Sequence, residues 1–256
     1  MRILDAQLAD LNSRFASAEP LDLLRFVHAV FGRRCAILTS MQRAGTTLCY
    51  LADRAQLDFD VLFVDTGVLH RETLATRDEL AMTHRNLRVI TLQSERSFMQ
   101  QTAEEGVLYL TREGQERCCD LRKSAPLQSV KGKYDAFIGA LRRGEGGARA
   151  NVKPFALDPE MNAFRIHPFA NVSSEDLENM AARVPDLVVN PLHAMGFSTI
   201  GCFPCTTPVR PDEPDRAGRW RHLAGVEYCG INPIDRGAAG SIEVADRYRE
   251  PLGLSE

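Results

Sequence analysis

Hydrophobic positions along the chain fall into short apolar runs that alternate with amphipathic stretches. Runs of this length are typical of buried strands, and they occupy residues 35–39, 60–64, 87–92, 134–141 and 163–168. Apolar residues at helical spacing predict helices between these runs, over residues 20–31, 48–57, 71–82 and 97–105, and after the cap signal at 173–176. Strands that alternate with helices predict an α/β fold with a mostly parallel sheet and helices on both faces.

Polar loops follow three of the predicted strands. Ser40 opens the loop 40–47, Asp65 and Gly67 follow the second strand, and Arg142 and Arg143 begin a glycine-rich loop after the fourth. Open α/β sheets bind ligands at the carboxyl ends of their strands, and a loop that leads into a helix directs backbone N–H groups at phosphate. Loop 40–47 lacks a complete glycine-rich signature, so an ordinary strand-to-helix connection remains the alternative there.

The chain changes character after residue 207, where Pro208, Pro211 and Pro214 interrupt any regular pattern and several arginines follow. We therefore expect an α/β domain over residues 1–207, which carries the polar loops above and the cysteine pairs described below, and a flexible, irregular C-terminal tail over 208–256. A chain of 256 residues with 44% hydrophobic residues can bury a large core.

Composition and charge narrow the partners and the compartment. A formal net charge of −3 gives no reason to expect a nucleic-acid partner. No apolar run approaches membrane-spanning length, and the first residues lack the basic and apolar regions of a signal peptide. We expect a cytoplasmic protein without membrane contact, with homo-oligomerisation left open.

Two cysteine pairs are the strongest chemical signal in the sequence. Cys118 and Cys119 are adjacent, and Cys202 and Cys205 form a Cys-x-x-Cys turn. Cytosolic cysteines are more often metal-binding or catalytic than disulfide-linked. Four thiols in two pairs favour a tetrathiolate centre, either a [4Fe–4S] cluster or a structural zinc ion, and a redox disulfide is the third possibility. Cys35 and Cys49 lie in apolar segments and are expected in the core.

Longer motifs around these cysteines resemble those of the sulfonucleotide reductases, the assimilatory adenylyl-sulfate and phosphoadenylyl-sulfate reductases. The most specific are Cys-Cys-Asp-Leu-Arg-Lys at 118–123, Asn-Pro-Leu-His at 190–193, Ile-Gly-Cys-Phe-Pro-Cys-Thr at 200–206 and Arg-Ala-Gly-Arg-Trp at 216–220. Val-Asp-Thr-Gly at 64–67 and Leu-Arg-Arg at 141–143 are similar to two further family loops. The resemblance covers roughly residues 35–231 and implies an adenine-nucleotide α-hydrolase-like, Rossmann-like fold.

The resemblance also implies the roles of individual residues. Cys118, Cys119, Cys202 and Cys205 would bind a [4Fe–4S] cluster, and the complete set favours adenylyl sulfate over its 3′-phosphorylated form. Lys123, Arg216 and Arg219 would bind sulfate and phosphate oxygens, together with Arg142 and Arg143 of the arginine loop. Asp65 and Gly67 would shape the adenosine pocket and Ser40 would contact the nucleotide. No chemistry is assigned to His193 or Trp220.

Cys229 is the candidate nucleophile, because it lies outside both cysteine pairs and follows an arginine-rich stretch that favours thiolate. It would attack the sulfur of adenylyl sulfate, expel AMP and carry an S-sulfocysteine, which thioredoxin or glutaredoxin would resolve to sulfite. Two stretches depart from the family pattern. The loop Ser-Met-Gln-Arg-Ala at 40–44 differs from the family's commoner Ser-Phe-Gly form, and the tail has Tyr228 inserted before Cys229 and Asn232 in place of a histidine.

Three other functions remain open from the sequence. Phosphoadenylyl sulfate is the alternative substrate. An ATP-pyrophosphatase-type sulfur-transfer enzyme would share the fold, although loop 40–47 lacks the Ser-Gly-Gly-x-Asp-Ser motif of that class. A cluster-bearing nucleotide sensor without enzymatic activity would share the ligands but not the reaction.

Overall fold

A six-stranded, mostly parallel sheet forms the centre of the protein, within the residues that the computed structural model describes, 2–223, 231–237 and 240–254. The strand order is β3-β2-β1-β4-β6-β5, and only β5 runs antiparallel to its neighbour. The strands are β1 (Cys35–Thr39), β2 (Asp60–Asp65), β3 (Arg88–Gln93), β4 (Ala136–Ile138), β5 (Phe155–Asp158) and β6 (Ala163–Ile166). The predicted fold class is confirmed.

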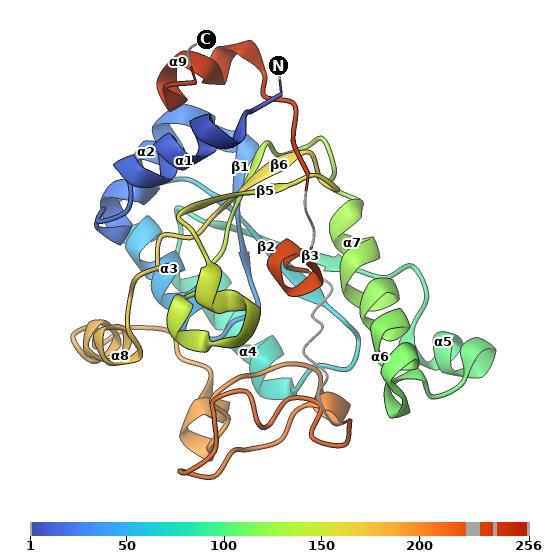
Figure 1. Ribbon diagram of the computed structural model, residues 1–256. Helices are drawn as coiled ribbons and strands as arrows, with labels where there is room; N and C mark the ends of the chain where they lie inside the picture. Colours follow the sequence, from blue (N-terminus) through green and yellow to red (C-terminus); the bar gives the residue numbers. More distant parts are fainter. Residues whose placement is uncertain (1, 224–230, 238–239, 255–256) are drawn as a thin grey trace.

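Helices cover both faces of this sheet (Figure 1). On one side lie α1 to α4, and on the other lie α6 and α7. The α-helices are α1 (Asp5–Arg14), α2 (Pro20–Phe31), α3 (Arg43–Arg54), α4 (Arg71–Thr83), α5 (Phe98–Glu105), α6 (Arg112–Cys119), α7 (Ala125–Gln128), α8 (Ser174–Ala182) and α9 (Arg249–Leu252). None of the helices in the described ranges is both long and apolar enough to cross a membrane.

The side chains of β1 explain why two layers of helices are needed. Cys35 and Ile37 point into the larger core cluster with α2 and α3, whereas Ala36, between them, joins a second cluster with Leu127 of α7. All three are fully buried, as expected for a central parallel strand. Cys49 is likewise fully buried in the larger cluster, so the expectation that Cys35 and Cys49 are core residues is confirmed.

Most strands and helices predicted from the sequence pattern begin and end within a few residues of the observed ones. It gave helix 20–31 and strand 35–39 with the observed bounds, but α3 begins at Arg43 and not at residue 48. Polar residues 43–47 form its first turn, and three of them, Gly45, Thr46 and Thr47, are buried, so apolar spacing could not mark the start. The short strand β5, which pairs antiparallel with β6, was not predicted.

The C-terminal residues return to the main domain. Ile242, Val244, Tyr248, Leu252 and Leu254 are buried in the same core cluster as β1, and Arg2 bridges to Glu243. Figure 1 places α9 beside the N-terminal helices α1 and α2. Residues 240–254 therefore belong to the folded body, while the predicted boundary at residues 207 and 208 stays a prediction.

Asp60, at the start of β2, supports a test of the fold. It accepts two hydrogen bonds from Arg88 at 2.8 Å and one from the Tyr134 hydroxyl at 2.6 Å. Burial alone would raise the pKa of Asp60, but these hydrogen bonds outweigh it and hold the pKa below its ordinary value.

We expect Tyr134→Phe to lower the free energy of unfolding by about 1.5–3 kcal/mol, because a buried hydrogen bond to a carboxylate is lost. Urea denaturation at pH 7 measures this loss. Tyr50→Phe is the matched control, since the half-buried Tyr50 hydroxyl has no hydrogen bond among the described residues, and its cost should stay within about 0.5 kcal/mol. Equal losses in the two variants would contradict the assignment.

Candidate active site

The carboxyl ends of β1 and β4 border a cavity of about 640 Å³. These two strands are neighbours, but the chain leaves β1 toward β2 on one side and reaches β4 on the other. Such a switch point is where open α/β sheets bind ligands, because the two following loops diverge and leave a crevice. Ser40 and Gln42 line the cavity on the β1 side, and Gly139 and Arg142 line it on the β4 side.

The loop after β1 is held in place by residues from a distant part of the chain. Gln42 donates to the Ser40 hydroxyl at 2.8 Å and accepts from the backbone N–H of Ile200 at 2.8 Å. His193 Nε2 accepts from the backbone N–H of Arg43 at 3.1 Å, while its Nδ1 faces the Phe197 carbonyl at 2.8 Å. Burial lowers the pKa of His193, in agreement with a neutral ring that donates at Nδ1 and accepts at Nε2.

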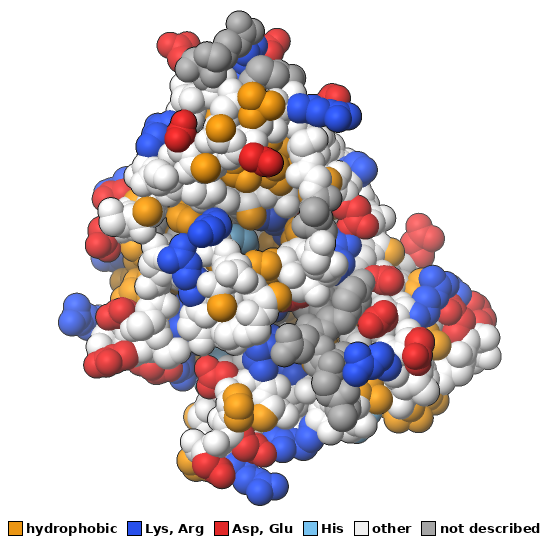
Figure 2. Space-filling model, viewed as in Figure 1, with side chains coloured by type: hydrophobic (Ala, Val, Ile, Leu, Met, Phe, Trp, Pro, Cys, Tyr) orange, Lys and Arg blue, Asp and Glu red, His pale blue; other side chains and the backbone are white. Residues whose placement is uncertain are grey.

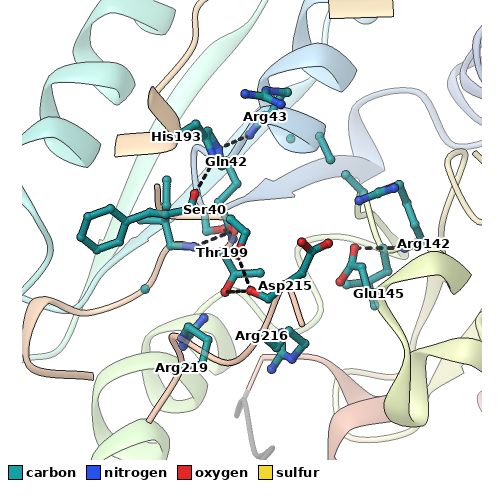
Figure 3. Close-up of a pocket in the computed structure, with 18 of the residues that line it drawn as sticks. Ser40, Gln42, Arg43, Arg142, Glu145, His193, Thr199, Asp215, Arg216 and Arg219 are labelled. Atoms are coloured by element: carbon teal, nitrogen blue, oxygen red, sulfur yellow. Dashed lines mark hydrogen bonds between the residues drawn. The ribbon is translucent and has the colours of Figure 1, made fainter. Parts of the chain in front are cut away.

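Among the charged side chains in the described lining of the cavity, Lys and Arg outnumber Asp and Glu. Figure 3 shows Arg216 and Arg219 together in the lower part of the view and Arg142 on the right. Lys123, 7% exposed, also faces the cavity. In the space-filling view, Lys and Arg side chains lie in and around the hollow at the middle of this face (Figure 2). The cavity is therefore suited to an anionic ligand.

Several acidic residues of the lining are already paired with arginines. Glu178 pairs with Arg43, Glu145 with Arg149, and Glu213 with Arg221 at 2.8 Å. The negative charge of these three glutamates is thus offset locally by the paired arginines.

The four cysteines of the two pairs line one small cavity of about 20 Å³. Cys118 and Cys119 end α6, which continues through a π-helical turn (Asp120–Ser124) into α7. The Cys202–Cys205 turn is joined to the loop after β2, because Leu69 bridges to Cys202 and Phe203 N–H donates to the Val68 carbonyl at 2.8 Å. Two remote segments thus meet at this cavity.

Hydrogen-bonding side chains surround the cysteine sulfurs; the amide and the ammonium donate to sulfur, whereas Thr66 and Cys202 can each be the donor. Gln115 Nε2 lies 3.0 Å and Lys123 Nζ 3.5 Å from Cys119 Sγ, and Thr66 Oγ1 lies 3.2 Å from Cys202 Sγ. Trp220, 1% exposed, also lines the cavity, and its indole N–H has no acceptor among the described residues. Donors directed at sulfur are typical of thiolate ligands in metal centres.

The cysteine cavity has the four sulfur ligands of a tetrathiolate site, but the sulfurs are not spaced as they would be around a bound metal centre. Within the described ranges no group of three or more Cys, His, Asp or Glu side chains is close enough to hold a metal ion as placed, and the cavity has room for about one water molecule. Burial raises the pKa of Cys118 and raises that of Cys205 to about 12, so both remain thiols at neutral pH without a metal. Four sulfurs and the unpaired indole donor fit an iron–sulfur cluster, provided that the side chains move apart to admit it.

Lys123 and Cys202 line both cavities. The wall between the anion-binding cavity and the cysteine cavity therefore consists of a buried cation and one of the four sulfurs. Any anion at this end of the larger cavity lies next to the cysteine set.

Comparison with known proteins assigns the chain to a family. The model of the phosphoadenosine phosphosulfate reductase domain matches residues 34–208. The adenosine 5′-phosphosulfate reductase of Rhodococcus opacus is 34% identical over 89% of this chain and 96% of that protein. The Streptomyces coelicolor enzyme of the same name is 35% identical over 84% and 89%, respectively.

The chain belongs to the phosphoadenosine phosphosulfate reductase family.

Solved structures agree with this family in fold. The phosphoadenylyl-sulfate reductase of Candida auris, in a phosphate complex, superimposes with a TM-score of 0.68 at 16% identity, over 81% of this chain and 99% of that one. The FMN adenylyltransferase of Candida glabrata reaches a TM-score of 0.51 at 13% identity, over 99% and 92%. At these identities the likeness shows only the fold.

The structure brings together most residues that the family resemblance singled out. Those that line the large cavity are Ser40, Lys123, Arg142, Arg216 and Arg219, and those that line the small one are Cys118, Cys119, Cys202 and Cys205. Cys229 lies outside the described residues.

Three residues that were predicted to contact or shape the nucleotide site have other contacts in the structure. Arg143 is not in the described cavity lining, and its guanidinium donates to the Val152 carbonyl at 2.8 Å. Asp65 accepts from the backbone N–H of Gly67 and from Gln93, both at 2.8 Å, so the two predicted residues form a turn that presents Thr66 to the cavity. Gly67 has φ +74° and lies close to the Arg122 guanidinium, which explains the need for glycine.

Sequence reasoning missed Gln42, Arg43, Thr66 and Arg149 as cavity residues. Gln42 and Arg43 belong to loop 40–47, for which the sequence already gave phosphate binding as one interpretation. Their position in that loop is the signal that could have identified them. His193 was set aside without a role, yet it orients the loop through the backbone of Arg43.

His167 supports a pH test of this site. It is 6% exposed, and its ring packs against Gly139 of the cavity lining, with Nδ1 3.3 Å from the Gly139 carbonyl. Burial, together with nearby Arg165 and Arg149, lowers the pKa of His167 to about 4.

Between about pH 6.5 and 4 the unfolded chain binds a proton at His167 that the folded protein excludes. The stability contributed by neutral His167 is therefore full above pH 6.5, is lost as the pH falls toward 4, and amounts to about 3 kcal/mol. Urea denaturation from pH 7 to 4 should give a flatter profile for His167→Gln than for wild type. The same substitution at exposed His222 should leave the slope unchanged, and a wild-type slope in His167→Gln would refute the assignment.

Proposed function

We propose that this protein reduces adenylyl sulfate to sulfite and AMP, as an oxidoreductase of sulfate assimilation. The observation that carries the proposal is the wall formed by Lys123 and Cys202, which borders both the anion cavity and the cysteine cavity. The relatives named adenosine 5′-phosphosulfate reductase, 30–35% identical over most of their length, support this substrate.

The nucleotide is proposed to lie across the switch point between β1 and β4. Ser40 and the N-terminus of α3 would face the phosphate, since a loop that leads into a helix offers N–H donors. Lys123, Arg216 and Arg219 would hold the sulfate and phosphate oxygens, the arginines through two-point contacts. A cavity of about 640 Å³ is of the size usual for sites that bind small molecules and cofactors.

Arg219 is preorganised for this role. Its guanidinium lies 4.3 Å from the centre of the Trp220 ring, and a Cβ at Gly201 would approach it to 2.6 Å. Only glycine at residue 201 leaves space for the side chain in this orientation. Stacking on an aromatic ring leaves the edge of a guanidinium available to an anion.

Cys229 is proposed as the nucleophile. Its thiolate would attack the sulfur of the substrate, the bond from sulfur to the bridging oxygen would break, and AMP would leave with that electron pair. The product on the enzyme would be S-sulfocysteine. A dithiol protein, thioredoxin or glutaredoxin, would then attack Cys229 Sγ, release sulfite and become oxidised to its disulfide, which supplies the two electrons.

Cys118, Cys119, Cys202 and Cys205 are proposed to hold a [4Fe–4S] cluster. When bound, the cluster would join the two cysteine segments and place its electrostatic field beside Lys123. The donors from Gln115, Thr66 and Lys123 would stabilise the sulfurs as thiolates. The reaction is proposed to take place in the cytoplasm.

The first of three predictions from the proposed function tests the reaction itself. Purified protein with adenylyl sulfate and a dithiol should release sulfite and AMP in equal amounts, and Cys229→Ser should abolish release while nucleotide binding stays within about threefold. Without thiol, wild type should gain the mass of one SO₃ on the peptide that contains Cys229, because the intermediate persists until a thiol attacks it. No sulfite from wild type would favour the sensor or sulfur-transfer alternatives, and a label on Cys35 or Cys49 would exclude Cys229.

The second prediction concerns the cluster. Anaerobically purified protein should be brown, absorb broadly near 400 nm and contain about four irons per chain, an expectation of cluster chemistry. Cys205→Ser should lose most of this iron, whereas Cys49→Ala, which changes a core cysteine, should keep it. Stoichiometric zinc without iron would refute the proposed cluster.

The third prediction concerns the substrate. The value of kcat/KM should be at least tenfold higher for adenylyl sulfate than for phosphoadenylyl sulfate, a difference of about 1.4 kcal/mol in transition-state binding. Its reasons are the complete cysteine set and the pairing of Arg43, at the start of α3, with Glu178, which makes this cavity-lining cation less available to a further phosphate. A preference for the phosphorylated substrate would make the alternative correct.

A further inference from the structure

A buried ion pair joins the arginine loop to the segment that resumes after the undescribed residues 224–230. Arg149 donates to both carboxylate oxygens of Asp235, at 2.9 and 2.6 Å, and also pairs with Glu145. The side chains of Arg149 and Asp235 are 11% and 5% exposed. This pair is therefore shielded from solvent, unlike most ion pairs at a protein surface.

The partners lie on two short helical segments on one wall of the large cavity. Arg149 belongs to η5 (Gly147–Asn151), which follows Arg142 and Glu145, and Asp235 belongs to η8 (Pro233–Arg236). Figure 1 shows the red turn of η8 beside the yellow-green turns of residues 143–151. The cavity lining includes Arg142, Glu145 and Arg149 from the first segment and Ile231 and Asn232 from the second.

Further contacts fix the same segment to the sheet. Arg165 of β6, itself bound to Asp158 at 2.6 Å, donates to the Ile231 carbonyl at 3.1 Å. Arg236 pairs with Glu160, and Asn232 donates to Asp235 at 3.1 Å. The residues of this segment that make these contacts, Ile231, Asn232, Asp235 and Arg236, lie two to seven residues after Cys229 in the sequence.

We propose that Arg149 and Asp235 are positioning residues for the proposed reaction. Their ion pair joins residues 231–236 to the loop of Arg142, and together these form one wall of the proposed nucleotide cavity. The chain on the C-terminal side of Cys229 is thereby held in a fixed position beside the proposed substrate site. The expected effect on kcat rests on the proposed function. The anchoring of residues 231–236 by the ion pair does not depend on activity.

The physical reason for a kinetic effect is the cost of positioning. When a nucleophile is held near the atom that it attacks, little conformational entropy is lost on reaching the transition state. When the chain that carries it is not anchored, this entropy is lost in every turnover and the barrier is higher. Binding of the substrate should depend far less on the pair, because Lys123, Arg216 and Arg219 lie on other segments. Loss of the pair should therefore lower kcat more than it raises KM.

Asp235→Asn tests the inference, since it keeps the shape of the side chain and removes its charge. Asp135→Asn is the matched control: Asp135 accepts two hydrogen bonds from Arg34, at 2.5 and 2.7 Å, and precedes β4 at the opposite edge of the sheet. Both variants should lower Tm. Only Asp235→Asn should lower kcat for sulfite release, by at least tenfold, with KM for adenylyl sulfate within threefold of wild type.

Hydrogen exchange supplies the readout that does not depend on activity. In Asp235→Asn the amides of residues 231–237 should exchange faster than in wild type while those of 246–254 stay protected, and in Asp135→Asn the reverse should hold, because Tyr248 donates to Asp135 at 2.5 Å. If Asp235→Asn does not fold, Arg149→Lys keeps the charge, removes the two-point contact and should give a smaller change in the same direction.

Three outcomes would overturn the inference. Unchanged exchange at 231–237 would show that the pair does not anchor the segment, whether or not the protein reduces adenylyl sulfate. An unchanged kcat with faster exchange would reduce the pair to a structural role, and a rise in KM as large as the fall in kcat would make it a substrate-binding element. If wild type releases no sulfite, the proposed function fails and the exchange result alone decides the anchoring.

Discussion

Two consecutive buried cations, Arg122 and Lys123, constrain how the elements around the site are arranged. Neither side chain can lose its hydration without acceptors, so each element packed against them has to offer one. Arg122 donates to the backbone carbonyls of Thr66, after β2, at 2.5 Å and of Arg96, after β3, at 2.8 Å. Lys123 lies 3.5 Å from Cys119 Sγ. The helix that carries both cations is thereby fixed against the carboxyl edge of the sheet and against the cysteines.

The π-helical turn at residues 120–124 makes this arrangement possible. Arg122, Lys123 and Ser124 are all buried in it, although successive residues of a regular helix face different directions. A wider turn brings neighbouring side chains toward the same side. It also starts directly after Cys119, so the cysteine pair and the two cations share one local distortion of the helix.

The sequence predicted the sheet because its signal is local. Strands such as β2 are continuous apolar runs, and Gly32 stops α2 where expected. The cavity was predicted only in part, because its geometry depends on long-range contacts: the turn of Asp65 and Gly67 faces Arg122, and Arg143 turns to a carbonyl nine residues away. Family motifs identify candidate residues, but not which member of the Arg142–Arg143 pair lines the cavity. That choice depends on competing backbone acceptors that no motif records.

The C-terminal residues show the same dependence on long-range contacts. Three prolines and many charges made the segment after residue 207 resemble a flexible tail, yet Ile242, Val244 and Leu252 complete the main core. Their apolar positions are too few and too widely spaced to give a periodic signal, so burial could not be read from the sequence. Because both this core contact and the Arg149–Asp235 pair lie beyond Cys229, the chain after that residue is tied to the body twice. The proposed nucleophile, Cys229, would thus be joined to a fixed segment, and an attachment of this kind favours attack at one atom over general reactivity.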